Sequence, residues 1–191
     1  MGQGAPYNMT RLVAYGDAIA AGLAKTNPQM LNLASPGRGF VANNLASTMP
    51  IQPGDTVLIS IGWSDAAALF SPNPVIPFAV YERRYLTRLH EITGRNAHAP
   101  TILLGMEPLT RPYPGLNNTL LLPMNQLLEK LARRAEITYL DLAANPVGHR
   151  AIDGLLYQPD GYRLLLARCG HLGNGLSLSP QLGTAITLRP M

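Results

Sequence analysis

Short apolar segments alternate with segments of helical spacing along most of this chain, and this alternation limits the folds open to it. Residues 56–61 (Thr-Val-Leu-Ile-Ser-Ile) form a short, largely β-branched run, which is typical of a strand buried on both faces. Strands that alternate with helices predict an α/β fold, a three-layer αβα sandwich around a parallel five-stranded sheet. The predicted strands are residues 11–15, 30–33, 56–61, 101–105 and 138–142, and the predicted helices are residues 18–24, 40–48, 80–93, 120–135 and 160–168.

The composition indicates one folded domain with a segment at each end. Of the 191 residues, 47% are apolar and 14% are charged, so the chain can bury one core and is not disordered. We expect an N-terminal segment at residues 1–10, an α/β domain at residues 11–168 and a C-terminal extended arm at residues 169–191.

The basic residues predict a solvated surface rather than a nucleic-acid partner. The net charge is +4, and 13 of the 15 basic residues are arginines. They are scattered along the chain, with short pairs only at Arg83-Arg84 and Arg133-Arg134. A nucleic-acid patch would require a more concentrated stripe of positive charge.

The sequence predicts neither export, membrane insertion nor a metal. Residues 1–8 lack the basic and apolar regions of a signal peptide, and no apolar run has the length of a membrane span, so we expect synthesis in the cytoplasm. Cys169 is the single cysteine, which excludes a disulfide framework and favours a buried structural thiol. The four histidines lack metal-ligand spacing, and we expect no cofactor.

The stretch from Arg11 to Gly22 places a candidate site after the first predicted strand. An apolar run breaks at Gly16-Asp17, and a helix is predicted to begin directly afterwards. A strand, a tight turn and a helix N-terminus direct free N–H groups and the positive end of the helix dipole at the residue on the turn. That residue is Ala18, which carries no reactive group.

Four short blocks resemble those of the SGNH (GDSL-type) esterase and lipase superfamily. They are residues 16–19 (Gly-Asp-Ala-Ile), 32–37 (Asn-Leu-Ala-Ser-Pro-Gly), 62–65 (Gly-Trp-Ser-Asp) and 153–162, which begin Asp-Gly-Leu-Leu-Tyr. The blocks occur in the family order and mostly follow predicted strands, and together they cover about residues 11–168. The resemblance implies a flavodoxin-like SGNH fold.

The resemblance also assigns catalytic roles to positions that have lost the necessary groups. The nucleophilic serine of the family corresponds to Ala18, and the histidine base corresponds to Leu156. The glycine and asparagine that donate to the oxyanion correspond to Ala34 and Ser64. Asp153 alone keeps the family residue, with no histidine to orient. Acyl transfer needs all of these groups, so the resemblance implies a degenerate site.

Other residues near the predicted site leave alternatives open. Asp17 and Asp65 could join Asp153 in acid–base chemistry or cation binding, but the family pattern favours a role in holding loops. Trp63 is expected either to stack on a sugar or apolar ligand or to pack under a loop. Tyr157 completes the candidate pocket.

Residues 169–191 extend past the last predicted helix. A glycine-broken turn at residues 169–175 precedes two extended segments, residues 176–179 and 184–188. An extended arm is suited to pairing with another chain, whereas a hairpin packed on its own domain is the alternative.

These observations favour a catalytically inactive protein that serves as a structural or binding subunit of a larger assembly, such as a virion or another particle. Its expected partners are other protein chains bound through residues 169–191, with no nucleic acid and no membrane. One alternative is an active esterase or glycan deacetylase with a non-standard or partner-supplied site. Another is a carbohydrate-binding protein that keeps the pocket without the reaction and takes a glycan ligand.

Overall fold

The computed structural model describes residues 11–172, which form a single parallel sheet flanked by helices. The strand order is β2-β1-β3-β4-β5, and every pair of neighbours is parallel. The predicted α/β fold is therefore confirmed. The strands are β1 (Leu12–Gly16), β2 (Leu31–Ala34), β3 (Thr56–Ser60), β4 (Thr101–Leu104) and β5 (Thr138–Leu140).

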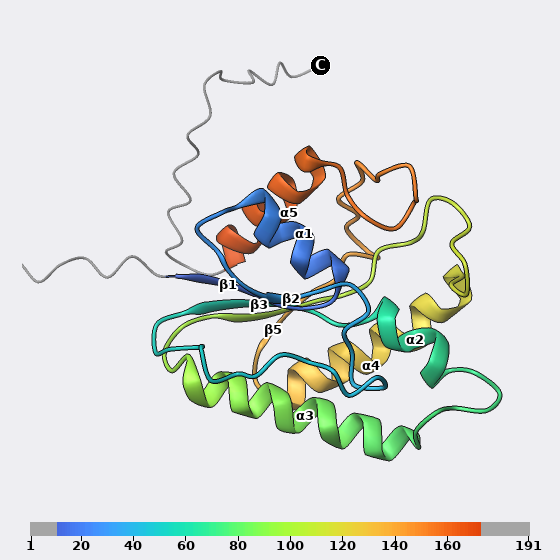
Figure 1. Ribbon diagram of the computed structural model, residues 1–191, viewed down its shortest axis with the longest axis horizontal. Coiled ribbons are helices and arrows are strands. Elements are labelled where there is room, and N and C mark those ends of the chain that lie inside the picture. The colour runs from blue at the N-terminus through green and yellow to red at the C-terminus, as the bar shows by residue number, and fades with distance from the viewer. Residues whose placement is uncertain (1–10, 173–191) are drawn as a thin grey trace, which may run out of the picture.

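Helices cover both faces of the sheet and complete the predicted three layers (Figure 1). Helices α1 (Ala18–Thr26) and α5 (Pro159–Leu172) lie together on one face. Helices α2 (Trp63–Leu69), α3 (Phe78–Arg95) and α4 (Leu121–Arg134) lie on the other, and a short 3₁₀ turn (Asn118–Leu120) leads into α4. Within residues 11–172, no helix combines the length and the apolar character needed to cross a bilayer.

The central strand β3 is covered on both faces, which explains the apolar residues at its three middle positions. All five of its residues are buried. Val57 and Ile59 belong to the core beneath α3 and α4, whereas Leu58 belongs to the core beneath α1 and α5. Successive side chains of a strand point to opposite faces, so the consecutive apolar residues of a covered strand enter the cores on both sides of the sheet.

The predicted helix at residues 40–48 is wrong. This segment is a loop, because the carboxylate of Asp65 accepts hydrogen bonds from the backbone N–H groups of Phe40 (2.8 Å) and Val41 (3.1 Å). Asn43 adopts a φ of 52°, which no helical residue does. A contact with a residue far along the chain thus overrides the local spacing of apolar side chains.

Two other helices also differ from the prediction, α2 by its presence and α5 by its length. Helix α2 was not predicted, although it begins inside the third block at Trp63. Helix α5 continues through Leu172, so the predicted turn directly after Arg168 is wrong. Burial of Cys169 in the core under α1 and α5 accounts for the added turn and agrees with the expected structural thiol. The remainder of the predicted arm, residues 173–191, lies outside the described residues, as do residues 1–10.

Candidate functional site at the carboxyl edge of the sheet

The candidate site residues lie where strands end at one edge of the sheet. Ala18 is the first residue of α1, directly after β1, and Ser64 lies in the first turn of α2, after β3. Asp153 lies in the loop between β5 and α5. Because all the strands are parallel, these segments meet at the carboxyl edge, where ligands bind in open α/β sheets.

Asp17 holds the first turn of this edge together. Its side chain caps α1 by accepting a hydrogen bond from the N–H of Ile19 at 3.0 Å, and its second oxygen is 3.5 Å from the N–H of Gly62. Its own N–H donates to the carbonyl of Ser60 at 2.8 Å. Burial raises the pKa of Asp17 to about 6. This carboxylate joins the loops after β1 and β3 rather than facing a ligand.

Asp65 has a similar role one loop further along. It is 1% exposed, and both oxygens accept the backbone hydrogen bonds of Phe40 and Val41. Burial raises the pKa of the Asp65 carboxyl. Neither Asp17 nor Asp65 has an oxygen left exposed at the edge for acid–base chemistry.

The remaining family positions show no catalytic arrangement. Leu156 is half-buried and packs against both cores, and Ser64 is exposed. One oxygen of Asp153 accepts from the N–H groups of Leu155 and Leu156 at 2.9 Å each, which fixes the turn. The N–H of Ala34 donates to the Asn32 side chain at 2.9 Å, so the donor at this family position is already engaged.

The described residues form a small cavity at the carboxyl edge, lined by none of the family positions. Its volume is about 10 Å³, which is room for about one water molecule. Trp63 lines it but is 5% exposed and belongs to the core, so of the two predicted roles the structure shows packing. The lining residues are Ile19, Ser60, Gly62, Trp63, Leu104, Gly105, Met106, Glu107, Leu142, Arg150 and Tyr157.

A buried charged cluster fills the wall of this cavity. Glu107 accepts hydrogen bonds from the Tyr157 hydroxyl (2.7 Å) and from the N–H groups of Val147 (2.9 Å) and Gly148 (3.0 Å). Arg150 lies 3.6 Å from the same carboxylate and stacks on the Tyr157 ring, 4.1 Å from its centroid. Burial raises the pKa of the Tyr157 hydroxyl. The Glu107 carboxylate is fully engaged, whereas the buried Nε of Arg150 has no hydrogen-bond partner within residues 11–172, and none of the three side chains is a nucleophile of the serine type.

The sequence prediction included Tyr157 but missed Glu107 and Arg150. Glu107 comes shortly after β4, so the rule that functional residues follow strands would have found it. Arg150 had no such signal, because it lies in a long loop after β5. Among the described residues, no group of three or more His, Cys, Asp and Glu side chains is placed to hold a metal ion.

Solved structures with a similar architecture include esterases and lipases. An acetylxylan esterase, Axe2 from Geobacillus stearothermophilus, superposes with a TM-score of 0.56 at 15% identity over 85% of this chain and 93% of its own. A lipase/acylhydrolase from Enterococcus faecalis superposes with a TM-score of 0.57 at 20% identity, over 86% of this chain and 95% of its own. A protein from Parabacteroides merdae, described as a GDSL-like lipase, superposes with a TM-score of 0.59 at 13% identity, over 85% of this chain and 94% of its own.

This chain has the SGNH hydrolase fold. The likeness extends over nearly the full length of these three proteins, so the SGNH fold accounts for the whole described domain. No protein-family model matches the sequence, and no curated protein matches it either. At such low identities the SGNH fold is shared without any implication for the reaction.

Proposed function

We propose that this protein is a non-catalytic SGNH-fold protein that serves as a structural or binding subunit of a larger assembly. The observation that carries the proposal is the small volume of the cavity at the carboxyl edge, about 10 Å³, which cannot take an ester group. Glu107, Arg150 and Tyr157 occupy its wall, with Glu107 accepting a hydrogen bond from the Tyr157 hydroxyl and Arg150 3.6 Å from the Glu107 carboxylate. A hydrolase would need an open cleft at this edge.

The residue types at the family positions support the same proposal. Ala18 has no hydroxyl to attack a carbonyl, and Leu156 has no nitrogen to accept a proton. Removing the nucleophile or the base of such a triad costs a rate factor on the order of 10⁶. Asp153 is left to hold a turn through backbone hydrogen bonds.

The two alternatives have weaker support. The solved structures that resemble this one include an acetylxylan esterase and a peptidoglycan O-acetylesterase, which favours a deacetylase only by analogy of fold. A carbohydrate-binding role needs an exposed aromatic face, and Trp63 is buried in the core.

An esterase assay tests the absence of catalysis. The purified chain is expected to hydrolyse p-nitrophenyl acetate no faster than buffer. The double variant Ala18→Ser/Leu156→His is expected to recover at most a trace of activity. Ser64 leaves the oxyanion without the amide donor, a loss of about 3–4 kcal/mol. Leu156→His alone, which restores a base without a nucleophile, is the control.

Turnover by the unmodified chain would contradict this proposal. Loss of that turnover in Asp153→Asn would then assign the reaction to the carboxyl edge and favour the deacetylase. Asp153 is half-exposed and holds only a local turn, so this variant is expected to keep the fold.

Removing residues 173–191 tests the assembly role. Residues 11–172 already close a core on each face of the sheet, so we propose that the apolar residues beyond them pack against another chain. The truncated protein is expected to keep its helical circular dichroism signal and to sediment as a monomer, while the full chain sediments as an oligomer. Unfolding or precipitation of the truncated protein would show that this segment completes its own domain. The residues concerned are Leu176, Leu178, Ile186 and Leu188.

A further inference from the structure

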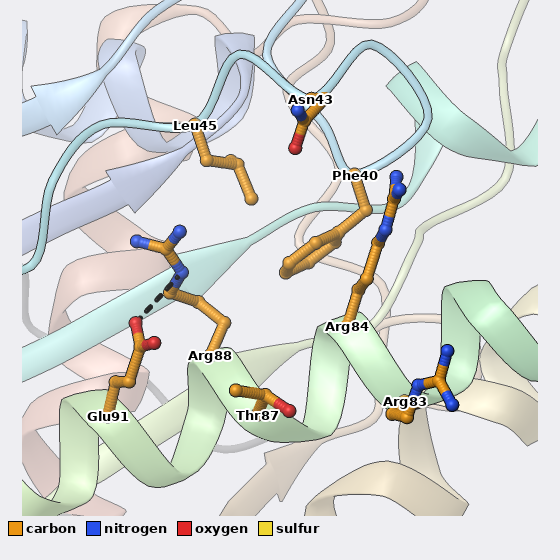
Figure 2. Close-up of a pocket in the computed structure, with 8 residues that line it drawn as sticks. All are labelled: Phe40, Asn43, Leu45, Arg83, Arg84, Thr87, Arg88 and Glu91. Atoms are coloured by element: carbon orange, nitrogen blue, oxygen red, sulfur yellow. Dashed lines mark ion pairs between the residues drawn. The ribbon is translucent and has the colours of Figure 1, made fainter.

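A hollow of about 310 Å³ lies between α3 and the loop that follows β2 (Figure 2). Its helical wall carries Arg83, Arg84 and Arg88, and the facing loop contributes Phe40, Asn43 and Leu45. None of these residues lines the cavity at the carboxyl edge, so the hollow is a separate feature of the molecule.

The arginines of this hollow differ in how they are engaged. Arg88 is held in place, with its Nε 3.3 Å from a Glu91 carboxylate oxygen and its guanidinium donating to the carbonyl of Ala46 at 3.2 Å. Arg84 extends beside the Phe40 ring towards the loop (Figure 2). Arg83 and Arg84 are both exposed, and neither forms an ion pair within residues 11–172. The charge of Arg84 is therefore available to a ligand in the hollow, whereas Arg83 points away from the facing loop (Figure 2).

Packing and hydrogen bonds anchor the wall opposite the arginines at Phe40. The ring of Phe40 is buried and packs against Tyr85, with centroids 4.4 Å apart, and against Tyr81, at 5.8 Å. The backbone N–H groups of Phe40 and Val41 donate hydrogen bonds to the Asp65 carboxylate. A hollow that keeps its shape without a ligand loses less entropy when one binds.

The charge of the hollow matches one phosphate group. Three arginines against Glu91 leave a net charge of +2 among its lining side chains. A phosphate monoester carries about −1.5 to −2 at pH 7. The guanidinium fork pairs with phosphate oxygens through two parallel hydrogen bonds. Thr87 and Asn43 add neutral hydrogen-bonding groups to the lining.

We propose that this hollow binds a small soluble phosphate monoester, with the phosphate held by the guanidinium group of Arg84. The volume is at the small end of the range for ligand pockets, which suits a molecule the size of a sugar phosphate. The binding site is on a different surface from the carboxyl edge, so it is independent of whether that edge is catalytic.

Titration with ribose 5-phosphate at constant ionic strength tests the proposal. Saturable binding is expected by calorimetry, with amide chemical-shift changes confined to residues 40–45 and 83–91, and ribose itself is expected not to bind. Arg84→Gln is expected to weaken binding about tenfold or more, because a charge-assisted hydrogen bond to the phosphate is lost. Arg84→Lys keeps the positive charge but lacks the forked guanidinium group. Its affinity for ribose 5-phosphate should lie between those of the unmodified chain and Arg84→Gln.

Arg163→Gln is the matched control, because Arg163 is also an exposed helical arginine but lies on α5. It should change the affinity less than twofold. Equal weakening by Arg84→Gln and Arg163→Gln would mean general charge screening and would overturn the proposal. So would equal binding of ribose and ribose 5-phosphate, or binding of single-stranded nucleic acid without any binding of ribose 5-phosphate. Arg84 is exposed, so circular dichroism should show that its variants fold.

Discussion

Replacing Glu107 with alanine is expected to lower the free energy of unfolding by about 3–5 kcal/mol. The Glu107 side chain is buried and accepts hydrogen bonds from the Tyr157 hydroxyl and from the N–H groups of Val147 and Gly148. Its removal leaves these donors unpaired and isolates the charge of Arg150, whose side chain is 4% exposed. A buried charge without its partner is among the most destabilising changes in a protein.

Urea denaturation followed by circular dichroism measures this loss. Glu129→Ala is the matched control, because Glu129 is half-exposed and lies 4.0 Å from Arg133 one helical turn away. The control should change the free energy of unfolding by less than about 0.5 kcal/mol. A loss below about 1 kcal/mol for Glu107→Ala would mean that water replaces the carboxylate, and that the carboxyl edge is more open than the cavity volume indicates.

Replacing Gly16 with alanine is expected to cost more than about 3 kcal/mol or to prevent folding. Gly16 ends β1 with a φ of +122°, a region that other residues rarely adopt. A Cβ atom there would lie 2.0 Å from the carbonyl oxygen of Ser60 and 2.7 Å from a side-chain carbon of Ile61. The backbone of Ser60 is paired with Gly16 in the sheet, so β1 and β3 would have to separate.

Gly54→Ala separates the two causes of that loss. Gly54 also has a positive φ, +88°, but nothing lies within 4 Å of its Cβ position. Gly54→Ala should therefore lower the free energy of unfolding only by the cost of the positive φ, about 1–2 kcal/mol. The difference between the two variants measures the clash with Ser60. Equal losses in urea denaturation would show that the strand moves at little cost.

The sequence predicted the strands well because their signal is local. In β3, the consecutive apolar residues Val57, Leu58 and Ile59 enter the cores on both faces of the sheet, and this run is visible in the sequence without knowledge of any neighbouring strand. The family blocks were also local, since each is a short segment directly at a turn. The strand assignments and the expected sheet edge followed from these segments alone.

The sequence failed where a distant residue decides the backbone. Residues 40–48 have helical spacing, yet Asp65 captures the N–H groups of Phe40 and Val41 and holds the segment as a loop. Helix α5 continues past the predicted end because Cys169 is buried against the core under α1. In each case the free energy of a tertiary contact exceeds the small local preference of a few residues.

The sequence by itself determined the α/β class, the edge at which the family positions gather and the loss of reactive groups at Ala18 and Leu156. Only the tertiary structure decided that Glu107 and Arg150, distant in the chain, close that edge around a cavity of about 10 Å³. It also decided that Arg84 and Arg88 of α3 line a hollow beneath the loop after β2. Periodicity reports which way a side chain points from its own element, whereas cavities and ion pairs depend on how separate elements pack.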